Sequence, residues 1–244
     1  MFALFKFDLP RAITEQLLEA IDGLKPGSLT EKSLQALEVF QKDEKIRHGV
    51  YVLFYSGDVM YVGKAKNLFE RLKQHWDKVR SRRNLNLAEV SFKCLLLDKN
   101  WQPSANENML IAHFKKKGQC QWNLNGFGPK DPGQRRDGAK PSGFDLAYPI
   151  NEDWKLDGLK NEYSAGELLA TMKGQLPFLL RYDLKHPALS TTHVDISGIP
   201  HTAKSLAVQV AKSLGSDWQL LLFKSHMTLY PNKRNFQFSE QLFP

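Results

Sequence analysis

Residues 49–63 constrain the fold more than any other part of the chain. Two short apolar runs, "GVYVLFY" and "VMYVG", flank Ser56-Gly57-Asp58. β-branched and aromatic residues on both sides of a glycine-containing turn are typical of a β-hairpin. The sequence therefore predicts two antiparallel strands joined by a three-residue turn.

A helix with a polar anomaly is predicted directly after this hairpin. It is capped by Asn67 and Glu70 and extends to about residue 79. Spacing of i, i+4, i+8 and i+11 gives its apolar stripe: Leu68, Leu72, Trp76 and Val79. Arg71 and His75 lie on or beside that stripe. Because an arginine facing a core without a partner costs several kcal/mol, Arg71 either pairs with a carboxylate or lines a cleft that binds an anion.

Glu107 poses the same question farther along the chain. Residues 88–98, "AEVSFKCLLLD", predict a third strand, and residues 104–117 a helix. Glu107 precedes that helix's apolar stripe by three, four and seven residues, so its carboxylate points toward the core. However, Ser104-Ala105-Asn106-Glu107 is also a capping-box pattern, and Glu107 capping its own helix is the alternative.

Positive charge is concentrated in the middle third of the chain. The net charge is +8, with eight Lys or Arg between residues 64 and 83 and seven between 115 and 140. Such clustering indicates a polyanion-binding protein, and a solvated basic face is the alternative. No apolar run approaches the roughly 18 residues of a membrane span, and two cysteines exclude a disulfide framework. Without a recognisable export leader, a reduced, cytoplasmic location is expected.

Three segments are predicted from the order of the elements. Residues 1–47 read as a helical segment, whose second helix starts at the capping-box pattern Ser28-Leu29-Thr30-Glu31. Residues 48–157 hold the hairpin, helix, strand and helix, followed by a basic loop at 124–150 with five glycines and four prolines and without expected regular structure. Residues 158–244 read as a small α/β unit, from helices at 164–173 and 202–214 and strands at 176–183, 192–197 and 218–224. The fold class is therefore α+β.

Taken together, these motifs resemble a known family. Residues 48–125 resemble the GIY-YIG nuclease superfamily. The resemblance rests on "GVY" at 49–51 and "YVG" at 61–63, followed by Lys64, a helical arginine, a helical glutamate and an asparagine. The stretch "QWNLNGFGPKDPGQRR", with Asp145 and Trp154 downstream, is similar to the type II restriction endonucleases that cut CCGCGG, which extends the resemblance to about residue 155. The insert that those enzymes carry between the two tyrosines is absent here. The resemblance implies a core of a three-stranded sheet flanked by helices.

The resemblance also implies roles in proton transfer. Tyr51 would be the general base or a phenol that positions water, and Tyr61 would orient the nucleophile or the phosphate. Lys64 and His75 would assist the proton transfer. Which of Tyr51, Lys64 and His75 is the general base stays open.

Three further roles concern charge and closure of the site. Arg71 would bind the scissile phosphate, and Asn123 would close the site. Glu107 would ligate Mg²⁺, for which Mn²⁺ can substitute, because Mg²⁺ needs only one or two carboxylates besides water and substrate oxygens.

The implied function is a metal-dependent DNA endonuclease, expected to cut a GC-rich palindrome in double-stranded DNA as a homodimer. A cognate DNA methyltransferase and a role in restriction–modification and antiviral defence accompany that family. The alternatives are a defence or mobile-element nuclease of loose specificity that needs a partner protein, and a non-catalytic DNA-binding module. The basic residues predicted to contact DNA are Lys66, Lys73, Arg80, Arg82, Arg83, Lys130, Arg135, Arg136 and Lys140. Of these, Arg135 and Arg136 either read guanine or bind backbone phosphate.

Overall fold

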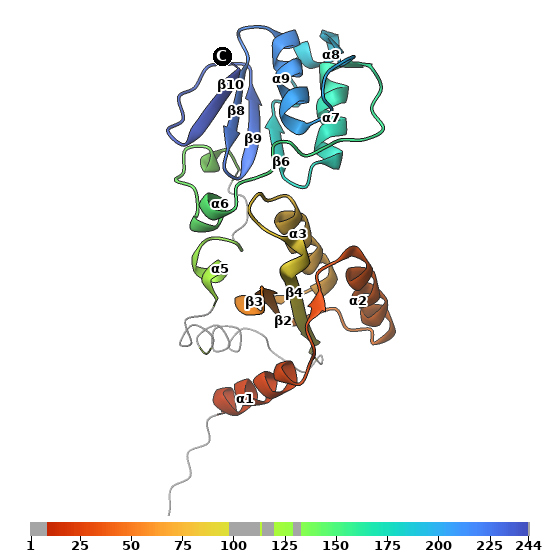
Figure 1. Ribbon diagram of the computed structural model, residues 1–244, viewed down its shortest axis with the longest axis vertical. Coiled ribbons are helices and arrows are strands. Elements are labelled where there is room, and N and C mark those ends of the chain that lie inside the picture. The colour runs from red at the N-terminus through yellow and green to blue at the C-terminus, as the bar shows by residue number, and fades with distance from the viewer. Residues whose placement is uncertain (1–8, 98–112, 114–119, 129–132, 244) are drawn as a thin grey trace, which may run out of the picture. The chain divides into compact units, whose positions relative to one another are not determined.

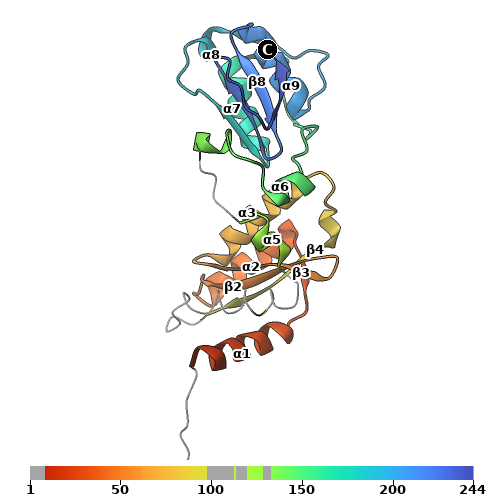
Figure 2. The same ribbon diagram turned by 90° about the vertical axis from the view of Figure 1, so that its left-hand side faces the viewer.

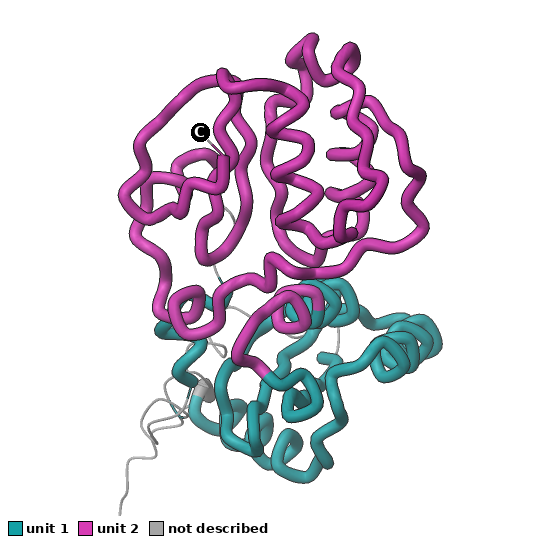
Figure 3. Tube along the Cα trace, turned by 45° about the horizontal axis from the view of Figure 1, so that its top comes forward, with its two compact units in different colours: residues 1–76, 86–128 teal, residues 77–85, 129–244 magenta. Residues whose placement is uncertain are grey.

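The chain forms two compact units in a computed structural model that describes residues 9–97, 113, 120–128 and 133–243. Unit 1 comprises residues 1–76 and 86–128, and unit 2 comprises residues 77–85 and 129–244 (Figure 3). Much of the Gly/Pro-rich loop thus packs within unit 2, together with a short segment from the middle of the chain. Among the described residues, no helix combines the length and apolar character needed to cross a membrane.

The sheet of unit 1 contains the predicted hairpin. The strands lie in the order β1 (Gly27–Ser28), β4 (Val90–Leu96), β2 (Gly49–Tyr55) and β3 (Asp58–Ala65), and every pair is antiparallel (Figure 1). The three long strands are the predicted ones, and the two-residue β1 was not expected. The turn has two residues rather than three: Ser56 and Gly57 both have positive φ, which matches the right-handed twist of the flanking strands.

The first helices of unit 1 are α1 (Leu9–Asp22) and α2 (Glu31–Asp43), as predicted. The predicted start of α2 is wrong by two residues. Thr30 is the N-cap, and its side chain and that of Ser33 satisfy each other's backbone N–H groups. Ser28 cannot serve as the cap because its backbone is paired with Ser91 in the sheet.

The later helices of unit 1 lie next to the hairpin. Helix α3 (Leu68–Arg80) follows β3, as predicted, and the boundary between the units falls within it. The Glu70 N–H lies 3.4 Å from the Asn67 side-chain oxygen, consistent with the predicted cap. The short helices η1 (Leu87–Glu89) and α5 (Gln121–Leu124) complete the described elements of this unit, whereas the helix predicted at 104–117 lies outside the described residues apart from His113.

Strand pleating divides the core of unit 1 into two faces. Val50 and Val52 pack with Leu17 and Ile21 of α1 on one face. Tyr51 alternates with them and therefore points to the other face, where α3 lies. The hairpin thus places Tyr51 between the sheet and α3.

Unit 2 is built on a second four-stranded sheet. Its strands lie in the order β10 (Ser239–Phe243), β8 (Gln219–Phe223), β9 (His226–Tyr230) and β6 (Leu179–Tyr182), and only β6 and β9 are parallel. Helices α7 (Ala165–Gln175) and α9 (Ala203–Leu214) pack against this sheet in a shared apolar core (Figures 1 and 2). Both helices and strands β6 and β8 were predicted. Strands β9 and β10 were not.

Short elements complete unit 2. Strands β5 (Glu162–Ser164) and β7 (His193–Asp195) pair with each other, and α8 (Ala188–Thr191) precedes β7. The expectation of a loop without regular structure at 124–150 is wrong, because it contains η2 (Gly133–Arg136) and α6 (Gly143–Ala147).

Candidate active site

The two tripeptides of the hairpin owe their glycines to close packing. Tyr51 of β2 lies opposite Gly63 of β3, and its ring crosses the space that a side chain at Gly63 would fill. A Cβ there would lie 2.4 Å from the Tyr51 hydroxyl oxygen. At Gly49, a Cβ would lie 2.0 Å from the Leu95 carbonyl oxygen. Both glycines are therefore sterically required by the position of Tyr51 and by the pairing of β2 with β4.

Tyr51 and His75 form the buried centre of the site. Both side chains are almost completely buried, and the Tyr51 hydroxyl oxygen lies 2.7 Å from His75 Nε2. Arg71 Nε donates to the same hydroxyl oxygen at 3.3 Å. Because this oxygen accepts from Arg71, its own hydrogen can point to His75 when Nε2 carries no proton. The three side chains therefore form a chain of hydrogen bonds from the guanidinium to the imidazole.

The positive charge of Arg71 has only neutral partners in the described part of the chain. Besides Tyr51, its guanidinium donates to the Gln74 side-chain oxygen at 3.1 Å and to the Gly128 carbonyl at 3.2 Å. Arg71 is only partly buried. A partly accessible cation that has no paired carboxylate in the described ranges is compatible with the anion-cleft alternative.

Burial keeps the Tyr51 phenol neutral. Burial raises the pKa of Tyr51 far above its usual value, and the neighbouring Tyr61 raises it further, while Arg71 acts in the opposite direction. Tyr51 is therefore a hydrogen-bonding phenol at neutral pH and not a phenolate. In this state it can pass a proton on but cannot act alone as a strong base.

Tyr61 lies beside this chain of hydrogen bonds. It pairs with Leu53 in the register and is the diagonal neighbour of Tyr51 on the same face of the hairpin. The centres of the two phenol rings are 5.9 Å apart, and the Tyr61 ring is 5.2 Å from the His75 imidazole. The structure thus brings Tyr51, Tyr61 and His75 together.

Asn123 binds the outer edge of the hairpin. Its side-chain oxygen accepts from the Val62 N–H and its amide donates to the Val62 carbonyl, both at 2.9 Å. Together with the hydrogen bond from the Cys120 N–H to the Val59 carbonyl, this arrangement covers the free edge of β3 with α5. Asn123 is therefore joined to the strand residue between Tyr61 and Gly63.

Two predicted residues are not brought to this centre by the described structure. Lys64 lies opposite Val50 in the register, so the pleat directs it to the face away from Tyr51, where it is exposed. Glu107, the predicted metal ligand, lies outside the described residues. Across the described residues, no three His, Cys, Asp or Glu side chains gather closely enough to hold a metal ion by themselves.

The predicted DNA-binding residues fall into two groups. Four are exposed: Lys66, Lys73, Arg135 and Lys140. Four arginines are engaged within unit 2: Arg80 with Asp77, Arg82 with Asp145, Arg83 with Glu152 and Asp153, and Arg136 with Ser225 and Asp145. Lys130 lies outside the described residues.

Arg82 is the clearest case of a structural role. Its side chain is 4% exposed, lies 2.9 Å from the equally buried Asp145 carboxylate, and donates to the Tyr148 and Lys224 carbonyls. Burial alone raises the pKa of Asp145, but Arg82, Ser142 and Arg136 hold that pKa below its usual value. Arg82 therefore stabilises unit 2, and its side chain is not accessible to DNA.

A second buried carboxylate fastens the Gly/Pro-rich segment to the C-terminal sheet. Asp137 is 1% exposed and accepts from Arg181, from His226 Nε2 at 2.8 Å and from the Tyr230 hydroxyl at 2.7 Å. His226 Nδ1 lies 2.8 Å from the Ser225 hydroxyl, which accepts from Arg136. Sequence patterns did not single out Asp137, because a charged residue between glycines is typical of an exposed loop.

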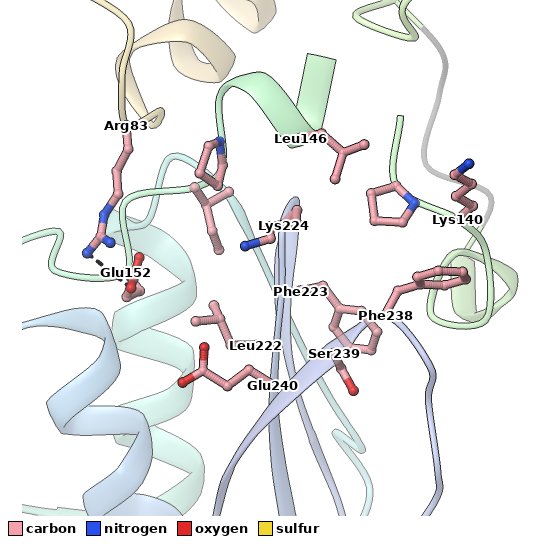
Figure 4. A pocket seen from close by; sticks show the side chains of 13 residues that line it. Arg83, Lys140, Leu146, Glu152, Leu222, Phe223, Lys224, Phe238, Ser239 and Glu240 are labelled. Atoms are coloured by element: carbon pink, nitrogen blue, oxygen red, sulfur yellow. Dashed lines mark ion pairs between the residues drawn. The ribbon is translucent and has the colours of Figure 1, made fainter. Parts of the chain in front are cut away.

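Unit 2 also contains a cavity of about 510 Å³ (Figure 4). Leu146, Phe223 and Phe238 contribute apolar surface to it, and Lys224 and the paired Arg83 and Glu152 contribute charge. Its lining contains none of the predicted catalytic residues, all of which belong to unit 1.

Comparison with known families gives a match over part of the chain. Residues 59–164 match the family model of the Eco29kI GIY-YIG domain. The match includes "YVG", Arg71, His75 and Asn123 and extends beyond the predicted limit near residue 155. It begins after Tyr51, whose place in the site rests on its pairing with Gly63. Among curated proteins, no significant match was found.

Proposed function

We propose that this chain is a metal-dependent type II restriction endonuclease, because residues 59–164 match the model of the Eco29kI GIY-YIG domain, a family that acts on DNA phosphodiester bonds. Its target is a GC-rich palindrome, with CCGCGG as the first sequence to test. The observation that carries the proposal is the contact of Arg71, which has no carboxylate partner among the described residues, with the buried Tyr51 phenol next to His75. This arrangement provides a phosphate-binding cation beside a proton-transfer chain.

In the proposed mechanism, Arg71 binds the scissile phosphate and a water molecule attacks phosphorus from the side of Tyr51. As the new P–O bond forms, the water proton moves to the Tyr51 oxygen, while the phenol hydrogen moves to His75 Nε2. The bond from phosphorus to the leaving oxygen breaks, and that oxygen takes a proton from solvent. The high pKa of Tyr51 supports a relay through a neutral phenol, which makes His75 the final proton acceptor.

The proposal includes a divalent metal ion, Mg²⁺ or Mn²⁺, ligated by Glu107. The described residues provide no complete metal site, which is compatible with Mg²⁺ because this ion keeps several water ligands and uses phosphate oxygens. When bound, such an ion stabilises the negative charge that develops on the phosphate. Arg71, Tyr51 and His75 perform the steps described above with or without further ligands to that ion.

Exposed cations are proposed to bind the DNA. Lys66 and Lys73 in unit 1 and Arg135 and Lys140 in unit 2 are accessible for phosphate contacts. Arg136 is a poorer candidate for reading guanine because its guanidinium is already bound to Ser225 and Asp145. Arg135, its exposed neighbour, is therefore the proposed guanine-reading residue.

A measurement of binding against salt distinguishes the two roles of Arg135. If Arg135→Ala relaxes specificity at one base position, Arg135 reads a base. If the variant instead weakens binding to all sequences and flattens the salt slope by about one unit, Arg135 contacts phosphate.

Cutting both strands of a palindrome requires two active sites related by a two-fold axis, and we therefore propose a homodimer on DNA. A restriction enzyme of this kind works in the cytoplasm with a cognate DNA methyltransferase that protects the host sites. Analytical ultracentrifugation with a palindromic duplex should then give two protein chains per DNA molecule. One chain per duplex would contradict the dimer.

The central test is incubation of the full chain with unmethylated plasmid DNA in Mg²⁺ and in EDTA, followed by sequencing of the ends. Discrete Mg²⁺-dependent ends that share a palindrome are expected. Heterogeneous ends would favour a nuclease of loose specificity. Binding without cleavage in both Mg²⁺ and Mn²⁺ would favour a non-catalytic DNA-binding module.

A further inference from the structure

The turn that follows α5 places two residues against the catalytic centre. Gly126 has a φ of 79° and ends the helix in the left-handed conformation. The Phe127 N–H then donates to the Trp122 carbonyl at 3.1 Å, and the two rings pack at 4.8 Å. This hydrogen bond and the accompanying apolar contact are those of a Schellman cap, which fixes the direction in which the chain leaves the helix.

Phe127 packs against two rings of the site. Its ring stacks on the His75 imidazole at 4.7 Å with an angle of 16° between the planes, and the Tyr61 ring meets it nearly edge-on at 5.3 Å. Phe127 is 1% exposed, so these contacts are free of solvent. A flat aromatic face against an imidazole restricts its rotation about χ2, and this keeps Nε2 directed at Tyr51.

Gly128 lies against Arg71 and, like Phe127, against Tyr61. Its carbonyl accepts from Arg71 Nη2 at 3.2 Å, while Nε of the same guanidinium donates to the Tyr51 hydroxyl oxygen. A Cβ at Gly128 would lie 2.6 Å from the Tyr61 hydroxyl oxygen. A residue larger than glycine would therefore displace the Tyr61 phenol or move the carbonyl that holds Arg71.

We propose that Phe127 and Gly128 are positioning residues for phosphodiester cleavage: Phe127 acts through His75, and Gly128 acts through Arg71 and Tyr61. The proposal rests on the cleavage function proposed above and adds residues that act through other side chains of the site. Three side chains from β3 and α3 receive their final orientation from one turn that is distant in the sequence.

The first test is Phe127→Leu in the full chain, which keeps an apolar side chain and removes the flat ring. We expect kcat for plasmid cleavage to fall about 10- to 100-fold, because small displacements of reacting groups have effects of this size. The dissociation constant for DNA in Ca²⁺ should change less than about threefold, since Phe127 is buried. Phe144→Leu, at an equally buried phenylalanine of unit 2, is the matched control and should leave kcat within about twofold.

A double-mutant cycle separates positioning from general loss of packing. In the His75→Ala background, Phe127→Leu should lower the residual kcat by less than about twofold, because the group through which it acts is gone. If the effects of the two substitutions multiply, or if Phe127→Leu cleaves like the wild type, the proposal is wrong. Likewise, Gly128→Ala should lower kcat strongly in the wild type and weakly in the Tyr61→Phe background, where the hydroxyl that it would meet is absent.

Nuclear magnetic resonance keeps the proposal testable if the wild type does not cleave DNA, an outcome that would contradict the proposed function alone. The ¹⁵N shifts of the His75 imidazole report which nitrogen carries the proton. They should indicate one fixed tautomer in the wild type and an averaged ring in Phe127→Leu. Identical His75 shifts in both proteins would overturn the positioning role.

Discussion

The Tyr51 phenol occupies the space directly across from Gly63, where an added Cβ would lie 2.4 Å from its hydroxyl oxygen. This pairing explains why the second tripeptide of the hairpin ends in glycine. It also means that the backbone of β3 forms one wall of the pocket that holds the phenol. Any side chain at Gly63 must displace Tyr51 from His75.

Gly63→Ala should therefore impair both stability and cleavage. Overpacking of this kind destabilises by about 1–3 kcal/mol, and displacement of the phenol should reduce kcat by about 100-fold. Denaturant unfolding and plasmid cleavage measure the two effects. Gly174→Ala in α7 is the control, because a Cβ there meets nothing within 4 Å and should leave cleavage unchanged. Full activity of Gly63→Ala would contradict the proposed role of Tyr51.

Replacement of Arg71 should remove cleavage while leaving DNA binding largely intact. Arg71→Ala is expected to lower kcat by about 1,000-fold, since a cation at the developing charge is lost. Arg71→Lys should restore little of the cleavage activity, because a single ammonium group cannot donate to Tyr51, Gln74 and Gly128 at once. Arg11→Ala, which alters an exposed pair on α1, is the control for loss of charge. Rescue by lysine would show that Arg71 acts as a simple point charge.

The separation in sequence between contacting residues explains which parts of this site could be predicted. Residues 49–79 form a hairpin and an adjacent helix, so helical spacing sufficed to place Arg71 and His75 on or beside the apolar stripe, whereas Tyr51 was singled out by the resemblance to the GIY-YIG family. Phe127 and Gly128 were not found because their contacts span more than fifty residues, and no periodicity links them to α3. Similarly, the charges of the Gly/Pro-rich segment predicted an exposed loop, whereas Asp137 is buried against residues about ninety positions later.

The neutral state of Tyr51 has a consequence at alkaline pH. Its folded-state pKa is raised, so the folded protein keeps a proton that the unfolded chain loses above about pH 10. The stabilisation from the protonated phenol is therefore lost as pH rises above that value. Absorbance at 295 nm should show a tyrosine that ionises only as the protein unfolds, and Tyr51→Phe should remove this component. Complete ionisation of all tyrosines in the folded protein would contradict the burial argument.

The buried pair of Arg82 and Asp145 provides a test of the structural assignment of Arg82. Asp145→Asn leaves the guanidinium without its counter-charge and should destabilise unit 2 by about 3–5 kcal/mol. The double variant Arg82→Met with Asp145→Leu should be considerably more stable than Asp145→Asn alone, because no buried charge remains. Denaturant unfolding checks both. If Asp145→Asn instead weakens DNA binding without a loss of stability, the structural assignment is wrong and Arg82 contacts DNA.

His226 should make unit 2 sensitive to mild acid. Burial, together with the smaller effects of the Arg181 and Arg136 guanidiniums, lowers the pKa of His226 to about 4 against the opposing effect of the Asp137 carboxylate. Between about pH 6.5 and 4, the unfolded chain binds a proton at this histidine that the folded protein does not. The free energy of unfolding should therefore fall by up to about 3 kcal/mol as the pH decreases through this range.

His226→Gln should flatten that pH dependence, because glutamine can still donate to Asp137 but does not titrate in this range. His193→Gln is the matched control, since His193 is exposed and should leave the dependence unchanged. Urea unfolding at half-unit steps of pH between 4 and 7 measures all three proteins. An equally steep dependence in His226→Gln would mean that other groups carry the acid sensitivity, and the hydrogen bond to Asp137 would then stabilise unit 2 independently of pH.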